Sequence, residues 1–278
     1  MTLLAAPIPY IGAVARVRRG MGQIVIFAGI LRLVQFFFEM LNVSSRLQAV
    51  RPEATIDDGL GGQHSDSFLF LLACQVLMSA FMERGEEPVS LSDMLSEEQN
   101  NTIAFGFNGA LCFLLLHELG HIELGHTALG MHSEPMAMYG LLEPEDLSNE
   151  QAQEFDADDY ALEALNPQYR AGLISSLIHL FGSFALLEAF VGSMGDAHPL
   201  SINRLGRLAE QCDLDETERA VTDQFVKARV NFFREMTGRR EAAGGSLAGR
   251  IYKVMSVEHA RRVIEEVRRR VEHDHGKL

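Results

Sequence analysis

The chain has 278 residues, of which 47% are hydrophobic, enough to bury a core and too many for a disordered segment. Its net charge of -14 excludes general nucleic-acid binding, because contacts to phosphate need a basic surface. Cys74, Cys112 and Cys212 lack paired spacing, and the first arginines follow the first apolar residues, so we expect a cytoplasmic protein without a secretion signal.

The first predicted elements are a short extended stretch over residues 7–17 and a long helix. Residues 20–50 are apolar with few helix breakers, which predicts one helix interrupted only by scattered charges. Aspartates and glycines then cluster in residues 54–63, a composition typical of a turn and the best candidate for a domain boundary. We therefore expect residues 1–60 to form an N-terminal helical or docking segment.

Three apolar runs follow, at residues 67–82, 99–116 and 171–187. They approach the length of a membrane span, which needs about 20 predominantly apolar residues. Asparagines in the second run and His179 in the third favour buried core helices. Peripheral or partial membrane attachment is the alternative.

The helix predicted over residues 104–127 carries the sequence His117-Glu118-Leu119-Gly120-His121 near its end. At 3.6 residues per turn, His117 and His121 project from one face about 40° apart, so both imidazoles can reach one metal ion beside Glu118. This geometry is typical of zinc hydrolases. His126 would project about 140° away from His121 on a continuing helix, which indicates a surface or supporting position.

Catalytic zinc takes three protein ligands and a water molecule, so one more donor is needed. Thr127 occupies the position of a third histidine in the extended form of the motif. Glu154 and Asp158 share a face of a helix predicted over residues 149–165, which a capping box at Ser148 begins. One carboxylate would bind the metal and the other would orient a histidine. Spacing alone equally allows an acidic, solvated helix face.

The remaining segments are mostly helical. Residues 129–145 have the composition of a loop with a short edge strand near the cleft. Apolar periodicity predicts further helices over residues 171–194, 201–211, 216–237 and 256–272.

The basic end of the chain, residues 239–278, contains 10 Lys or Arg against 6 Asp or Glu. The helix predicted within it has one apolar stripe opposite a basic face. We expect a solvated helix face, and a contact for an acidic partner or lipid headgroups is the alternative.

Three motifs in order resemble those of known peptidases: His-Glu-x-x-His, then Glu154-x-x-Ala157-Asp158, then His198-Pro199 with Arg204 five residues after the proline. The set is similar to the gluzincin metallopeptidases, especially the group with the CAAX prenyl protease and the bacterial heat-shock membrane protease. It also resembles the phage-exclusion (Lit-type) peptidases. The resemblance covers residues 104–208.

Carried over by position, the resemblance implies that His117, His121 and Glu154 bind Zn²⁺. It makes Glu118 the residue that accepts a proton from the attacking water and returns it to the leaving amine. Asp158 would support a histidine ligand. His198 and Arg204 would complete the catalytic set, His198 by a hydrogen bond to the developing oxyanion and Arg204 by holding its loop or a substrate carbonyl.

These features predict a mainly α (α+β) fold. We expect a zincin-like catalytic domain over residues 61–238, with an active-site helix, a second ligand-bearing helix and at most a small edge sheet, followed by the basic helical segment 239–278. The predicted activity is zinc-dependent cleavage of an intracellular protein or peptide substrate, with Zn²⁺ as cofactor and no nucleic-acid partner.

Two alternatives stay open from the sequence. The same ligands would also suit a structural zinc site in a non-catalytic or partner-regulated protein, in which a protein side chain fills the fourth position. The apolar runs would suit a membrane-associated quality-control protease. The sequence identifies neither the residue to be cut nor the oligomeric state.

Overall fold

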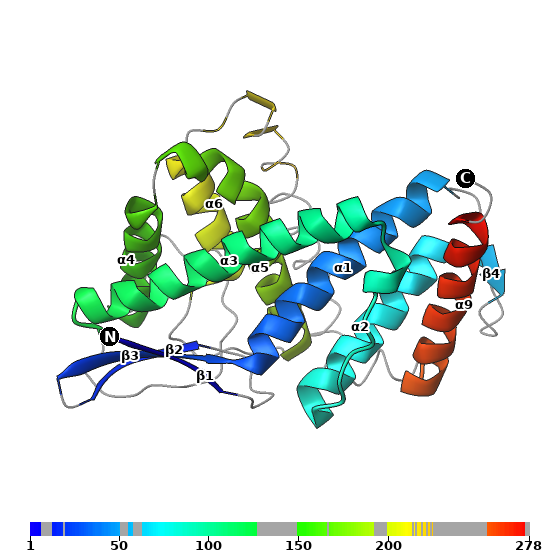
Figure 1. Cartoon of the computed structure of the whole chain (residues 1–278), viewed down its shortest axis with the longest axis horizontal. Coiled ribbons are helices and arrows are strands. Elements are labelled where there is room, and N and C mark those ends of the chain that lie inside the picture. The colour runs from blue at the N-terminus through cyan, green and yellow to red at the C-terminus, as the bar shows by residue number, and fades with distance from the viewer. Residues whose placement is uncertain are drawn as a thin grey trace, which may run out of the picture. The chain divides into compact units, whose positions relative to one another are not determined.

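The computed structural model describes the chain except for residues 7–12, 19, 51–54, 58–62, 127–148, 166, 192–198, 213, 215, 218, 221, 223, 225–254 and 276–278. The protein is mainly α-helical with a small three-stranded sheet and a separate pair of short strands, β4 and β5 (Figure 1), which confirms the predicted fold class. The elements are β1 (Thr2–Ala6), β2 (Ala13–Arg18), β3 (Met21–Phe27), α1 (Ala28–Val50), β4 (Thr55–Asp57), β5 (Gln63–Ser65), α2 (Asp66–Arg84), the 3₁₀ turn η1 (Ser92–Met94), α3 (Glu97–Glu123), α4 (Asn149–Ala164), α5 (Pro167–Val191), α6 (Ser201–Gln211) and α9 (Val257–His275).

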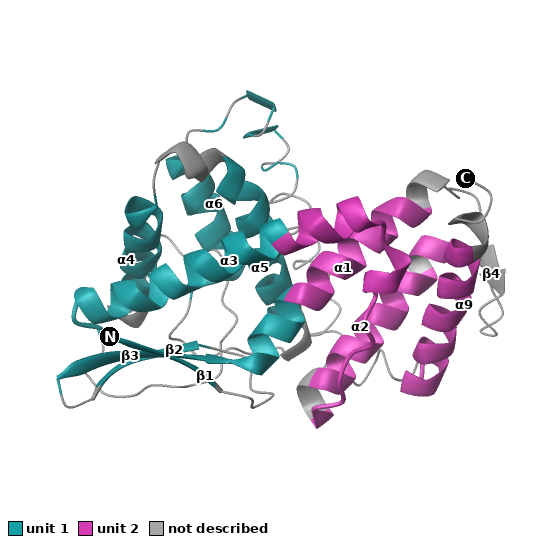
Figure 2. Ribbon diagram, viewed as in Figure 1, with its two compact units in different colours: residues 1–34, 105–244 teal, residues 35–104, 245–278 magenta. Residues whose placement is uncertain are grey.

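The chain forms two compact units (Figure 2). Unit 1 consists of residues 1–34 and 105–244, and unit 2 of residues 35–104 and 245–278. Each unit joins segments that are distant in the sequence, and helices α1 and α3 contribute residues to both. The linear division into residues 1–60, 61–238 and 239–278 stays a prediction.

The sheet of unit 1 corrects one predicted element. Strand β3 lies between β1, which is parallel to it, and β2, which is antiparallel. The long helix predicted from residue 20 begins only at Ala28, because the preceding Ile24-Val25-Ile26 run is β-branched and favours extended backbone. Ile24 and Ile26 are buried, and a side chain at Gly22 would lie 3.3 Å from Ile122 of α3.

Helix α3 crosses the core of unit 1. Phe113 is 1% exposed and its ring meets that of Phe181 from α5 edge to face, with centroids 5.9 Å apart. Helix α5 approaches closely, since a Cβ at Gly109 would lie only 2.5 Å from the Ser176 hydroxyl. Helix α3 is long and apolar enough to span a membrane, but the core helices of soluble proteins can have the same length and composition.

Unit 2 is built on the packing of α2 against α9. The apolar stripe predicted for the basic C-terminal helix is buried, including Ile264 and Val267 at 0% exposure. Arginines of the same helix pair within the unit: Arg270 lies 3.3 Å from the buried Asp66, and Arg268 lies 2.8 Å from Asp93. Part of the basic charge of this segment therefore has acidic partners in its own chain.

Candidate metal centre

The predicted site depends on a close approach of α3 and α4. Gly120 lies one residue before His121, and Ala157 lies one residue before Asp158. A Cβ on Gly120 would lie 3.2 Å from the Cα and carbonyl oxygen of Ala157 and 3.1 Å from the Tyr160 ring. Because Gly120 faces the backbone of Ala157 with no side chain between them, the two helices come near enough for a histidine pair and a carboxylate to meet.

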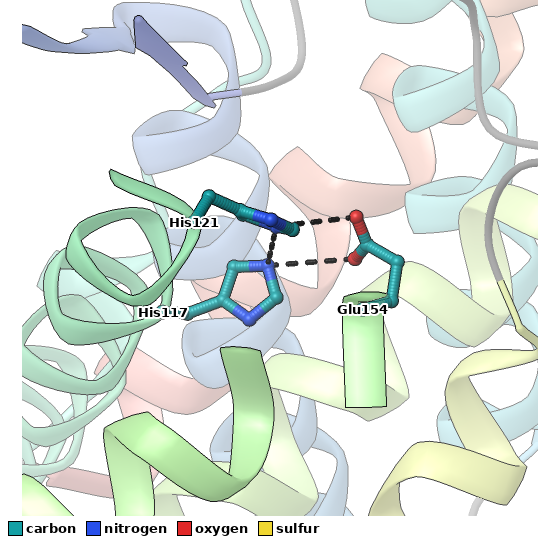
Figure 3. A group of neighbouring side chains, drawn as sticks. All are labelled: His117, His121 and Glu154. Carbon is teal, nitrogen blue, oxygen red and sulfur yellow. Dashed lines mark hydrogen bonds and ion pairs between the residues drawn. The ribbon is translucent and has the colours of Figure 1, made fainter. Parts of the chain in front are cut away.

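Figure 3 shows the imidazoles of His117 and His121 and the carboxylate of Glu154 pointing toward one another. The Nε2 atoms of the two histidines lie 3.2 Å apart. Each oxygen of Glu154 lies near a different histidine: Oε2 lies 3.4 Å from His117 Nε2, and Oε1 lies 3.3 Å from His121 Nε2. The structure thus brings together the three residues that the sequence resemblance implied as ligands.

The separations fit a tetrahedral zinc ion. Bonds of about 2.0–2.1 Å place neighbouring ligand atoms of such an ion about 3.3 Å apart, and the nearest separations here, which involve both oxygens of Glu154, are 3.2, 3.3 and 3.4 Å. Two imidazole nitrogens and one carboxylate are also a donor set that zinc accepts in hydrolases. Among the described residues the cluster supplies three donors, the number of protein ligands that catalytic zinc takes.

Behind the cluster, Asp158 and Arg204 hold His117 from the side opposite Glu154. Asp158 Oδ1 lies 2.9 Å from Nδ1 of His117. Arg204 donates to both oxygens of Asp158, from Nε at 2.8 Å and from Nη2 at 2.7 Å, and its Nη1 lies 3.1 Å from Oε2 of Glu154. Asp158 is 1% exposed, so this pair of hydrogen bonds is shielded from water.

This position defines what Arg204 does in the folded protein. Arg204 is 8% exposed, and its guanidinium contacts both Glu154, a candidate metal ligand, and Asp158, which lies behind His117. It also lies over the Phe181 ring, 5.1 Å from the centroid. The contacts are those of a residue that positions Glu154 and Asp158, and the predicted contact with a substrate carbonyl stays a prediction.

Helix α6 carries Arg204, and Glu188 of α5 contacts the first residue of that helix. Glu188 was not among the residues predicted from the sequence. Leu200 precedes the helix and offers no side-chain cap. Instead Glu188, 1% exposed, accepts a hydrogen bond from the backbone N–H of Ser201 at 2.9 Å and another from its hydroxyl. A carboxylate there accepts a hydrogen bond from a free N–H and interacts favourably with the positive end of the helix dipole.

Burial and interactions with neighbouring groups shift the pKa values of these side chains in opposite directions. Burial alone would lower the pKa of His117, but hydrogen bonds to Asp158 and Glu154 outweigh it and raise that pKa from 6.5 to about 9. Burial lowers the pKa of His121. Burial would raise the pKa of Asp158, but Arg204 holds it below its usual range. In the metal-free protein His117 therefore carries an added proton at neutral pH while His121 is neutral, and a bound cation would replace that added proton.

Glu118 and His198 are the remaining predicted catalytic residues. Glu118, the predicted general base, follows His117 on α3 and is 7% exposed. His198, the predicted oxyanion partner, lies outside the described residues, as do Thr127 and the predicted loop and edge strand over residues 129–145. The role of His198 therefore stays an expectation from the sequence.

Comparison with known proteins agrees with this geometry. No curated protein and no solved structure matched the chain. A family model described as Peptidase U49, a Lit-type peptidase family, matches residues 73–225, which is more than half of the chain and contains the whole cluster. The chain therefore belongs to the Peptidase U49 family and is a peptidase.

Proposed function

We propose that the protein is a zinc-dependent endopeptidase of the gluzincin type, with Zn²⁺ held by His117, His121 and Glu154. The observation that carries the proposal is the convergence of two imidazole nitrogens and the Glu154 carboxylate, whose nearest separations of 3.2 to 3.4 Å are those of neighbouring ligands on tetrahedral zinc. When bound, zinc would supply Lewis acidity and lower the pKa of a coordinated water toward about 7. Membership of a peptidase family supports peptide-bond hydrolysis as the reaction.

Glu118 is the proposed general base. It stands between the two histidine ligands in sequence, on the same helix, and is largely buried. A buried carboxylate next to the ligands can accept a proton from the attacking water and return it to the leaving amine. Arg204 and Asp158 would keep the ligands fixed while the charges change, because both are anchored by bidentate hydrogen bonds.

The proposed substrate is an intracellular protein. That location, and any peripheral attachment to a membrane, are proposals carried over from the sequence. A structural zinc site is the competing interpretation, and the three-donor cluster among the described residues favours the catalytic one, because catalysis needs an exchangeable position.

The test compares the wild-type chain with Glu118→Gln and with Glu123→Gln, an exposed glutamate at the end of the same helix. Each is expressed in cells, and new protein N-termini are quantified by mass spectrometry, together with the zinc content of the purified chain. We expect new termini with wild type and Glu123→Gln, their loss with Glu118→Gln, and equal zinc in all three. Undiminished cleavage by Glu118→Gln would refute the proposed mechanism.

A further inference from the structure

The turn after α3 brings His126 back to the metal cluster. The helix ends at Glu123, and Gly125 adopts a left-handed conformation with φ of 77°. Its N–H donates to the Ile122 carbonyl at 3.2 Å, a helix-ending turn that glycine adopts without steric cost. The chain therefore reverses where a continuing helix would have carried His126 about 140° away from His121.

The result is a direct contact between the two rings. Nδ1 of His126 lies 3.1 Å from Nδ1 of His121, with the ring centroids 5.2 Å apart and the planes at 66°. The contact uses the ring nitrogen of His121 opposite the cluster, since Nε2 is the atom that faces Glu154 and His117. His126 therefore reaches the ligand from behind and does not compete for the metal position.

Metal binding fixes where the hydrogens lie. A neutral imidazole carries one N–H, so a histidine that binds a cation through Nε2 carries its hydrogen on Nδ1 and donates it. For His117 the acceptor is Asp158 Oδ1, at 2.9 Å. For His121 the acceptor is Nδ1 of His126, whose own hydrogen then lies on Nε2. The two ligands thus differ, one being backed by a carboxylate and the other by a neutral ring.

We propose that His126 is a positioning residue for the metal ligand His121, holding its ring orientation and its tautomer through the Nδ1–Nδ1 hydrogen bond. The proposal rests on the proposed zinc site. The positive φ of Gly125 shapes the turn that places this acceptor at Nδ1 of His121.

Three substitutions separate a hydrogen-bonding role from a merely structural one. His126→Leu keeps similar bulk without an acceptor, and His126→Ala removes both. His126→Asn restores an acceptor, because its Oδ1 lies as many bonds from the backbone as Nδ1 of histidine. His259→Leu, on α9, is the matched control. Loss of such a partner typically weakens metal binding about 10- to 100-fold.

The full-length variants are compared by zinc affinity against a chromophoric chelator, by the visible spectrum of the Co²⁺-substituted protein, and by thermal unfolding. We expect His126→Leu and His126→Ala to lose about 10- to 100-fold in zinc affinity with an altered Co²⁺ spectrum. His126→Asn and His259→Leu should stay within a few-fold of wild type.

Wild-type zinc affinity in His126→Leu, or an equal loss in His126→Asn, would overturn the role of His126 while leaving the zinc site intact. Absence of zinc binding by the wild-type chain would instead contradict the proposed function, and the role of His126 with it.

Discussion

At the scale of single residues, Glu154 and Asp158 each contact both a histidine and an arginine. His117 contacts Asp158 through Nδ1 and Glu154 through Nε2, and Arg204 forms ion pairs with both carboxylates. The spacing of His117 and His121 is local, so the sequence predicted their pairing directly. Glu154 lies more than 30 residues beyond His121, so spacing left it as one of two candidate carboxylates and only the resemblance of ordered motifs singled it out.

The raised pKa of His117 predicts how the metal-free protein responds to pH. Folding raises this pKa from 6.5 to about 9, so the protonated ring stabilises the fold fully below pH 6.5, and this contribution is lost as the pH rises through about 9. Its size is about 3 kcal/mol. We expect the free energy of unfolding of chelator-treated protein, measured in urea, to fall between pH 6 and pH 10.

A His117→Gln variant isolates this effect, since it removes the titrating ring and should flatten that part of the pH profile. If wild type and variant fall in parallel, another group is responsible for the loss.

For His126 the predicted supporting position agrees with its contact to His121, but the predicted direction does not. The direction of 140° assumed a helix that continues, whereas Gly125 ends it with a positive φ. A glycine near a helix end signals such a turn, but the distance to the facing ring depends on tertiary structure.

At the scale of elements, helix–helix contacts decide which predictions hold. The helices over residues 67–82, 149–165 and 201–211 were predicted almost in full, because apolar periodicity or caps mark them locally. The start of α3 was placed too late. Ser96 and Gln99 form a reciprocal capping box, with N–O distances of 3.0 and 3.2 Å, and this pattern was visible in the sequence.

The contact of α3 with α4 predicts that Gly120→Ala weakens the metal site. The new methyl group would lie 3.1–3.2 Å from Tyr160 and Ala157, so α4 must shift and carry Glu154 with it. We expect a loss of roughly 1–3 kcal/mol in the free energy of unfolding and weaker zinc binding. Thermal unfolding and chelator competition measure the two effects.

Gly172→Ala is the control, since this exposed helical glycine of α5 has nothing within 4 Å of an added Cβ. It should be neutral or stabilising by up to about 1 kcal/mol. Equal behaviour of the two variants would argue against a close-packed α3–α4 contact.

The cap on α6 predicts a second effect on the site from a residue outside it. Glu188→Ala leaves the Ser201 N–H and hydroxyl without this acceptor, at a cost of roughly 1–3 kcal/mol. Because Arg204 lies on the same helix, one turn further on, we expect weaker zinc binding as well. Chemical denaturation and zinc titration provide both readouts.

Glu188→Gln keeps an acceptor oxygen and should retain more of both properties, whereas Glu210→Ala, at an exposed position of α6, should change neither. A Glu188→Ala variant that binds zinc as wild type would show that α6 is held by other contacts.

At the scale of the whole molecule, the metal cluster and the basic C-terminal helix belong to different compact units. All the residues of the metal cluster lie in unit 1, and the basic C-terminal helix packs in unit 2. The sequence predicted the apolar stripe of that helix but not its arginine partners, because Asp66 and Asp93 precede it by more than 160 residues. Long-range pairings of this kind leave no periodic signal.

A core substitution in unit 2 should therefore affect stability without affecting the metal. Ile264 is fully buried in α9, and Ile264→Ala should cost about 2–5 kcal/mol. We expect a lower denaturation midpoint, with zinc affinity unchanged at temperatures where the variant is folded. A tenfold loss of zinc affinity in the folded variant would show that the two units are energetically coupled.

The central claim is the convergence of His117, His121 and Glu154 on one zinc ion with an exchangeable ligand. Zinc K-edge X-ray absorption of the purified full chain tests it most directly. The expected result is one zinc per chain with four nitrogen or oxygen neighbours at about 2.0–2.2 Å, two of them imidazoles, and one solvent ligand displaced by a small hydroxamate. Zinc absent from the chain, bound through sulfur at about 2.3 Å, or insensitive to the hydroxamate would contradict it.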